Sequence, residues 1–186
     1  MVFIHDTQVA LNAAVDLVNS LPETDSEGTD RLCTAADLDE YLRTHDYTGD
    51  IRRDARELRE LRDIRPRLHE LWRTDRAGAV PLVNAMLRDG QALPQLVIHD
   101  DYDWHIHATS DAAPLATRIL VEAAMAFTDV IRSDAYDRVR VCAADDCGSV
   151  YVDYSRNGSK RYCDTGNCGN RMNVNAYRRR KAQESA

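Results

Sequence analysis

The sequence has no apolar stretch long enough to cross a membrane. Its longest apolar run, from Ile119 to Phe127, is interrupted by Glu122, whereas a spanning helix needs about 20 consecutive apolar residues. The first residues, Met1 to Asp6, also lack the basic region and apolar stretch of a secretory signal peptide. We therefore expect neither a membrane protein nor a secreted one, but a cytoplasmic protein whose thiols stay reduced.

Motifs typical of enzymes are missing as well. The chain contains no HExxH sequence, no glycine-rich phosphate loop and no nucleophile–base motif. The one candidate for such a site is a group of histidines beside an acidic turn, formed by His99, Asp100, Asp101, Asp103, His105 and His107. His105 and His107 would share one face of a strand and could bind a metal. An exposed strand face is the more common origin of such a pattern, so we predict no enzyme and no catalytic residues.

The charge is unevenly distributed along the chain. The 186 residues are 44% hydrophobic and 30% charged, as in a globular protein, and carry a net charge of −7, which alone disfavours a nucleic-acid partner. Residues 1–137 contain 14 Lys and Arg against 26 Asp and Glu, a charge of −12. Residues 138–186 contain 10 against 5, a charge of +5. This asymmetry indicates an acidic body with a basic end suited to an interaction.

Apolar periodicity predicts that residues 1–137 form a mainly helical domain. The expected helices are one capped by Asp6 and running to about Ser20, a short helix capped by Thr34, residues 50–73 with a kink or break before Pro66, residues 79–89 ending at Gly90, and residues 111–132 with Pro114 in the first turn. Residues 22–31 are polar and should form a loop. Leu96–His99 and Trp104–His107 predict a β-hairpin near residues 95–108. Trp72 and Trp104 are expected in the core or at a domain interface.

Four of the five cysteines lie in two closely spaced pairs. Cys142 and Cys147, then Cys163 and Cys168, are each separated by four residues, with fifteen residues between the pairs. This is the pattern of a tetrahedral four-thiolate zinc site, which leaves no open position for catalysis. Simple packing of buried thiols is the alternative, but the neighbouring Asp, Gly and Asn residues are typical of turns. We predict one structural zinc ion, with the distant Cys33 as a buried small residue.

The residues around these pairs predict a C-terminal zinc finger over 138–186. Ser149 to Asp153 is strand-like, Arg156 to Ser159 is a turn centred on Asn-Gly, and Lys160 to Tyr162 leads back to the second pair as the other arm of a hairpin. The residues after Cys168 are compatible with a helix. A knuckle, a hairpin and a second knuckle at a helix start together make a treble-clef-like zinc finger with four cysteine ligands.

The tetrapeptide Cys168-Gly169-Asn170-Arg171 and the segment Asp153 to Cys163 (DYSRNGSKRYC) resemble the CGNR zinc finger family, with Tyr162 in place of the expected tryptophan. The first helix, ending in Leu17-Val18-Asn19-Ser20, is similar to the start of the ABATE domain that usually precedes this finger. The resemblance is specific over Arg138 to Lys181 and looser before it. It implies a bacterial transcription regulator of the stress response.

Eight basic residues of the finger are candidates for contact with DNA. They lie on the predicted turn and the last helix: Arg156, Lys160, Arg161, Arg171, Arg178, Arg179, Arg180 and Lys181. Such side chains can neutralise phosphates and release counterions. We therefore predict a DNA-binding regulator whose helical domain senses a small-molecule effector or forms a homodimer.

Two alternatives to DNA contact stay open. The arginines of the last helix could shield the zinc thiolates or bind the acidic body, which would leave a zinc-stabilised module that binds a small molecule or a protein without DNA. Ion pairs between these arginines and the body would favour that alternative. Arg171 is also close enough to Cys168 in sequence to orient the metal site instead of touching DNA.

Overall fold

The computed structural model describes residues 3–45, 47–99 and 102–184. Within these ranges the chain is mainly helical, as predicted, with two small antiparallel sheets. The helices are α1 (His5–Val18), α2 (Ala35–Thr44), α3 (Ala55–His69), α4 (Arg76–Asp89), α5 (Leu115–Arg132) and α6 (Cys168–Glu184), and the strands are β1 (Gln95–His99), β2 (Tyr102–His107), β3 (Val139–Val141) and β4 (Val150–Val152). No helix in the described ranges is long and apolar enough to span a membrane.

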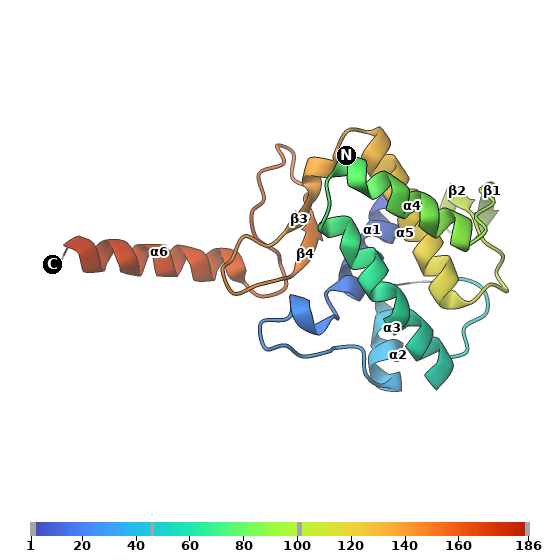
Figure 1. Ribbon diagram of the computed structural model, residues 1–186, viewed down its shortest axis with the longest axis horizontal. Coiled ribbons are helices and arrows are strands. Elements are labelled where there is room, and N and C mark those ends of the chain that lie inside the picture. Colours follow the sequence, from blue (N-terminus) through green and yellow to red (C-terminus); the bar gives the residue numbers. More distant parts are fainter. Residues whose placement is uncertain (1–2, 46, 100–101, 185–186) are drawn as a thin grey trace.

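Helix α5 lies at the centre of the helical body, and α1, α3 and α4 pack against it (Figure 1). Eleven of its side chains are buried, because apolar residues occupy most of its circumference. The ring of Phe127 meets the indole of Trp72 edge to face at 5.1 Å between centroids. Trp72 lies on a single 3-10 turn, Glu70–Trp72, that follows α3 directly. Its predicted place in the core is therefore confirmed.

Side-chain caps set the starts of three helices. Thr34 and Asp37 form a reciprocal capping box at α2, as the sequence predicts. Asp54 accepts a 2.8 Å hydrogen bond from the backbone N–H of Glu57, and Asp75 accepts one of 2.8 Å from Gly78. The predicted start of α1 is slightly wrong, because Asp6 lies within the first turn and its carboxylate complements the helix dipole from there.

The structure differs from two predictions that rest on prolines, the break before Pro66 and the start of the helix at Asp111. Helix α3 continues through Pro66 to His69 without a break. The carbonyl of Arg62, which would otherwise accept the N–H that proline lacks, instead accepts a 3.4 Å hydrogen bond from Nε of Arg65. Pro114 is the N-cap of α5 with an extended ψ of 138°, so this helix begins at Leu115 and not at Asp111. Helix conformation is disfavoured immediately before a proline, which explains the later start.

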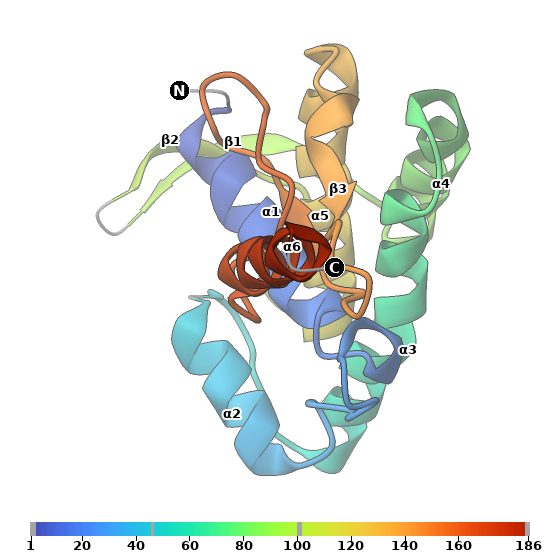
Figure 2. The ribbon, with the colours of Figure 1, turned by 90° about the vertical axis from the view of Figure 1, so that its left-hand side faces the viewer.

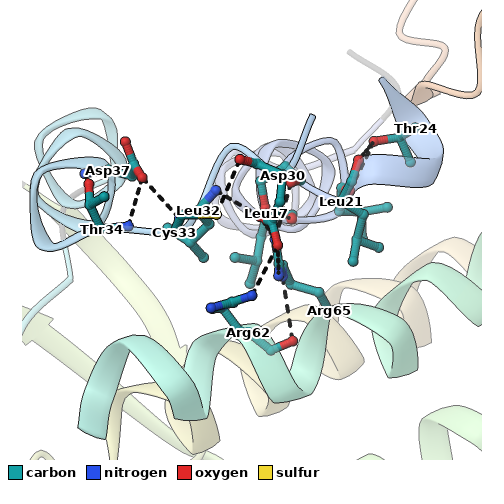
Figure 3. A network of polar contacts seen from close by, with 12 residues as sticks. Leu17, Leu21, Thr24, Asp30, Leu32, Cys33, Thr34, Asp37, Arg62 and Arg65 are labelled. Atoms are coloured by element: carbon teal, nitrogen blue, oxygen red, sulfur yellow. Dashed lines mark hydrogen bonds and ion pairs between the residues drawn. The ribbon is translucent and has the colours of Figure 1, made fainter. Parts of the chain in front are cut away.

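The polar segment 22–31 is largely irregular, as predicted, apart from a 3-10 turn over Pro22–Thr24. Asp30 attaches it to α3, since its carboxylate accepts hydrogen bonds of 2.7 and 3.0 Å from the two terminal nitrogens of Arg65 (Figure 3). Arg62 adds a third contact at 3.2 Å. The Arg65 guanidinium lowers the pKa of Asp30 to about 2. This bidentate pair fixes the loop between α1 and α2.

Strands β1 and β2 form the predicted hairpin, with Leu96 opposite Ile106 and an irregularity between Val97 and His99. The side chain of Trp104 is 63% exposed, so its predicted place in the core or at a domain interface is wrong. The strand period carries Trp104 and Ile106 to the outer face of the hairpin.

Strand β4 pairs with β3 and not, as predicted, with the residues after the Asn157-Gly158 turn. All three residues of β4 are buried, with Val150 and Val152 in the core of the helical body and Tyr151 among the cysteines. Such a doubly buried strand needs a partner that is itself anchored, and β3 follows directly from α5 through the turn Tyr136–Arg138. The finger therefore rests on the helical body, while α6 projects away from it (Figure 1, Figure 2).

Candidate metal centre and nucleic-acid interface

The four predicted metal ligands come from two turns that the fold brings together. Cys142 follows β3 and Cys147 precedes β4, so the first pair lies in the connection of this hairpin. Cys163 lies in the loop between β4 and α6, and Cys168 is the first residue of α6. Backbone hydrogen bonds hold the two turns, from Cys142 to the carbonyl of Ser149 at 2.8 Å and from Ala143 to that of Arg161 at 2.9 Å.

The sulfur positions fit a tetrahedral zinc site. All four Sγ atoms lie within 4.8 Å of one another. The distances Cys147–Cys163 and Cys163–Cys168 are both 3.7 Å, close to the edge of about 3.8 Å that a tetrahedron with Zn–S bonds of about 2.3 Å requires. A disulfide would need about 2.0 Å. The four cysteines are thus free thiols arranged to hold one structural zinc ion.

The surroundings of the sulfurs favour a closed, structural site. Cys142, Cys163 and Cys168 are buried and Cys147 is half-buried. Burial raises the pKa of Cys168 to about 12. Burial also opposes ionisation of Cys163, but the backbone N–H of Gly166 and the neighbouring thiols bring its pKa to about 7. When bound, a zinc ion would supply the positive charge that keeps all four as thiolates, and it would link both turns to the start of α6.

Arg171 contacts the metal centre directly. Its guanidinium donates to both carboxylate oxygens of Asp146, at 2.7 and 3.0 Å, and to Sγ of Cys168 at 3.2 Å. It therefore clamps the first turn of α6 to the first cysteine pair, as the alternative for this residue predicts. A cation here also offsets part of the net charge of −2 that four thiolates and one zinc ion would leave.

Two family models match this chain. The model described as "Putative stress-induced transcription regulator", ABATE, covers residues 11–134, which is more than half of the sequence. The chain belongs to the ABATE family. The CGNR zinc finger model covers residues 138–181, which include the four cysteines and most of α6, and so follows the ABATE region directly. No curated protein matches the chain. The resemblance seen in the sequence is confirmed, and the two models support a regulatory, zinc-binding role.

The remaining basic candidates of this ABATE protein lie on two exposed surfaces. Arg156 and Arg161 are exposed on the loop after β4, with Arg161 beside the ring of Tyr162, 5.8 Å from its centroid. Lys160 pairs with Asp164 and lies over the ring of Tyr151, 5.4 Å from its centroid. Arg178, Arg179, Arg180 and Lys181 are all exposed on α6.

Some residues that shape the finger of this ABATE protein were missed in the sequence. Asp153 is fully buried, and its carboxylate accepts 2.8 Å hydrogen bonds from the backbone of Ser155 and of Lys160. Burial opposes its ionisation, but these bonds outweigh that effect and lower its pKa. Arg138 and Arg140 donate to carbonyls of the same loop, at Ser155 and Lys160. The sequence signal for this buried carboxylate was an Asp two residues before a Ser, next to a turn that contains Asn-Gly.

The sequence offered two further candidates, the histidine group and Cys33. His105 and His107 lie with their Nε2 atoms 3.1 Å apart and are half-buried. Asp100 and Asp101 fall outside the described residues, as do the side chains of His99 and Asp103. Among the residues that are described, the four cysteines form the one group of three or more metal-ligating side chains. Cys33 is exposed and not buried as predicted, because it precedes the cap of α2.

Proposed function

We propose that this ABATE protein is a DNA-binding transcription regulator that contacts phosphates through α6 and the loop beside it. The observation that carries the proposal is the position of Arg178, Arg179 and Arg180. They are exposed on a helix that projects from the molecule (Figure 1), and among the described residues none of the three has an ion pair with the acidic body. Arg171 shields the cysteine site, but these three arginines have no such contact with the described part of the body, which supports a role for them in binding an external partner.

The size and charge of α6 suit a groove or backbone contact. Its 17 residues give a rod of about 25 Å. Three consecutive arginines followed by Lys181 spread positive charge over more than half of its circumference, and Tyr177 lies 58% exposed directly before them. Such a surface can contact phosphates in several orientations of the helix. We therefore expect the DNA affinity to depend strongly on salt concentration and only modestly on base sequence.

A cleft at the base of α6 extends this surface. It has a volume of about 340 Å³ and is lined by Lys160, Arg161, Tyr162 and Asn170, among others. Lys160 and Arg161 outnumber the one carboxylate in its lining, Asp164, which is paired with Lys160, and the cleft lies next to the zinc-held turn. We propose that this cleft binds one phosphate of the DNA backbone. The zinc site then acts by fixing α6 relative to this cleft.

The test is a salt titration of the zinc-loaded full chain with a fluorescently labelled duplex, read by anisotropy. The proposal is supported if the protein binds the duplex at low salt and the logarithm of its affinity falls linearly with the logarithm of the salt concentration. Absence of binding at about 50 mM salt, with zinc bound and the fold intact, contradicts it.

A second candidate is a zinc-stabilised module that binds a small molecule without DNA. The observation that favours it is a cavity of about 260 Å³, which lies between α1, α2 and Thr165 of the second cysteine turn. Its lining contains three carboxylates, Asp16, Asp37 and Glu40, against Arg31 and His45, so the excess of acidic groups favours a small organic amine. A thermal shift with putrescine or ethanolamine that is absent in Glu40→Gln would support this role. The same cavity would let an effector act on the finger of a DNA-binding regulator.

A further inference from the structure

The hairpin β1–β2 exposes an apolar outer face. Leu96, Ile98, Trp104 and Ile106 are exposed by 67, 56, 63 and 47%. Leu96 and Ile106 lie opposite each other in the register, and the strand period places all four on one side. We call these four side chains the outer face of the hairpin.

The other side of the hairpin is partly covered. Val97, His105 and His107 are half-buried, so the more polar face, with two histidines, is turned toward the molecule. A two-stranded sheet with one solvated face normally shows the opposite arrangement, with its apolar residues inward. Because these apolar side chains point away from the molecule, packing in its core does not explain why they are apolar.

The exposed area is comparable to the largest apolar patch of a typical monomeric protein. Taking about 180 Å² for a whole Leu or Ile and about 250 Å² for Trp, the outer face presents about 450 Å² of largely apolar surface. Patches of this size on monomeric proteins are often functional. Two such faces in contact would bury about 900 Å², which is below the area of about 1,200 Å² at which stable specific interfaces begin and in the range of weak, transient ones.

We propose that the chain forms a symmetric homodimer through the outer face of its hairpin. A second copy is the occupant that the area and chemistry favour, because the four side chains carry no charge that would select a differently charged partner. Each copy brings the same flat apolar strip, as a two-fold interface requires. The modest area makes the association weak and dependent on concentration.

This dimer would leave the finger accessible. The hairpin lies at the end of the molecule opposite α6 (Figure 1), so pairing of two hairpins covers neither α6 nor the cleft at its base. The inference does not depend on DNA binding, and either proposal can fail without the other.

The test is sedimentation velocity of the zinc-loaded full chain from about 1 to about 200 µM. We expect the sedimentation coefficient of the unmodified protein to rise with concentration, and that of Leu96→Thr/Ile106→Thr to stay at the monomer value. Threonine keeps the β-propensity of these positions and removes most of their apolar area. The matched control is Ile4→Thr, an equally exposed apolar residue outside the hairpin (64% exposed), which should associate like the unmodified protein.

A second measurement covers the case in which the hairpin variant misfolds. Iodide quenching of tryptophan fluorescence in the unmodified protein should decrease with concentration, because Trp104 becomes covered while Trp72 is buried throughout. A monomer at every concentration, or a dimer in which quenching stays constant or the threonine variant associates normally, would overturn the proposal.

Discussion

Asn19 at the end of α1 makes two hydrogen bonds with the backbone of Val150 in β4. Its side-chain nitrogen donates to the carbonyl at 2.9 Å, and its side-chain oxygen accepts from the N–H at 2.8 Å. Trp72 adds a 3.1 Å bond from its indole nitrogen to the carbonyl of Tyr151. The strand that leads away from the first cysteine pair is thus attached to the ABATE helices at consecutive residues, which ties the orientation of the finger to the helical body.

Asn19→Ala should lower the free energy of unfolding by about 2 kcal/mol, because it leaves two backbone groups of a buried residue without their partner. Urea unfolding of the zinc-loaded protein measures the change. Asn12→Ala is the matched control on the same helix. The side chain of Asn12 accepts an exposed hydrogen bond from Tyr154, so its replacement should change the free energy of unfolding by no more than about 0.5 kcal/mol. Equal losses in both variants would contradict this attachment.

The Asp30–Arg65 pair predicts a defined dependence of stability on pH. The Arg65 guanidinium lowers the pKa of Asp30 from 3.8 to about 2, so the pair stabilises the fold above pH 4 and its contribution is lost as the pH falls toward 2. Asp30→Asn should lower the free energy of unfolding by about 2 kcal/mol at pH 7.

The pH series of the two proteins provides the check. The difference in unfolding free energy between Asp30→Asn and the unmodified protein should shrink between pH 4 and pH 2, while any loss of zinc in acid affects both alike. A difference that stays constant over this range would show that Asp30 acts by packing and not by charge.

Replacement of any one of the four clustered cysteines by serine should abolish stoichiometric zinc binding. Elemental analysis should find one zinc ion per unmodified chain and far less in Cys163→Ser, because three thiolates and a hydroxyl hold zinc much more weakly. Cys33→Ser is the control and should retain one zinc ion, since Cys33 is remote from the site. Loss of zinc in Cys33→Ser, or its retention in Cys163→Ser, would refute the ligand set.

Arg171 should act on the metal centre more than on DNA. Arg171→Lys keeps the positive charge but loses the two-point contact with Asp146, so zinc affinity should fall by about 10- to 100-fold. Competition with a chromogenic chelator measures this. DNA affinity at saturating zinc should remain close to that of the unmodified protein. Unchanged zinc affinity combined with weakened DNA binding would assign Arg171 to the DNA contact instead.

The parts that could be predicted from the sequence are those set by local chemistry. The four ligands follow from their spacing, the capping box at Thr34 from two neighbouring side chains, and the hairpin at 95–108 from its alternating pattern. Each of these signals is contained in a short stretch of chain, so no knowledge of the tertiary structure is needed to recognise it.

What could not be predicted depends on contacts between distant segments. Strand β4 pairs with β3. Its position is set by Asn19, Trp72 and the core of the helical body, which are all distant from β4 in the sequence. The strand pattern cannot say which face of the hairpin turns outward, which is why the predicted place of Trp104 is wrong. Helix α3 continues past Pro66 because another side chain satisfies the freed carbonyl.

The salt dependence of DNA affinity tests the central claim most directly. Anisotropy titrations from about 50 to about 300 mM salt give the slope of log affinity against log salt. Arg178→Ala/Arg179→Ala/Arg180→Ala should weaken binding and reduce the steepness of this slope by about 0.9 for each lost phosphate contact, up to about 2.7. Arg43→Ala/Arg56→Ala/Arg73→Ala removes the same charge from exposed positions on the helical body and should leave the slope unchanged. Equal slopes for both variants and the unmodified protein would contradict the role proposed for α6.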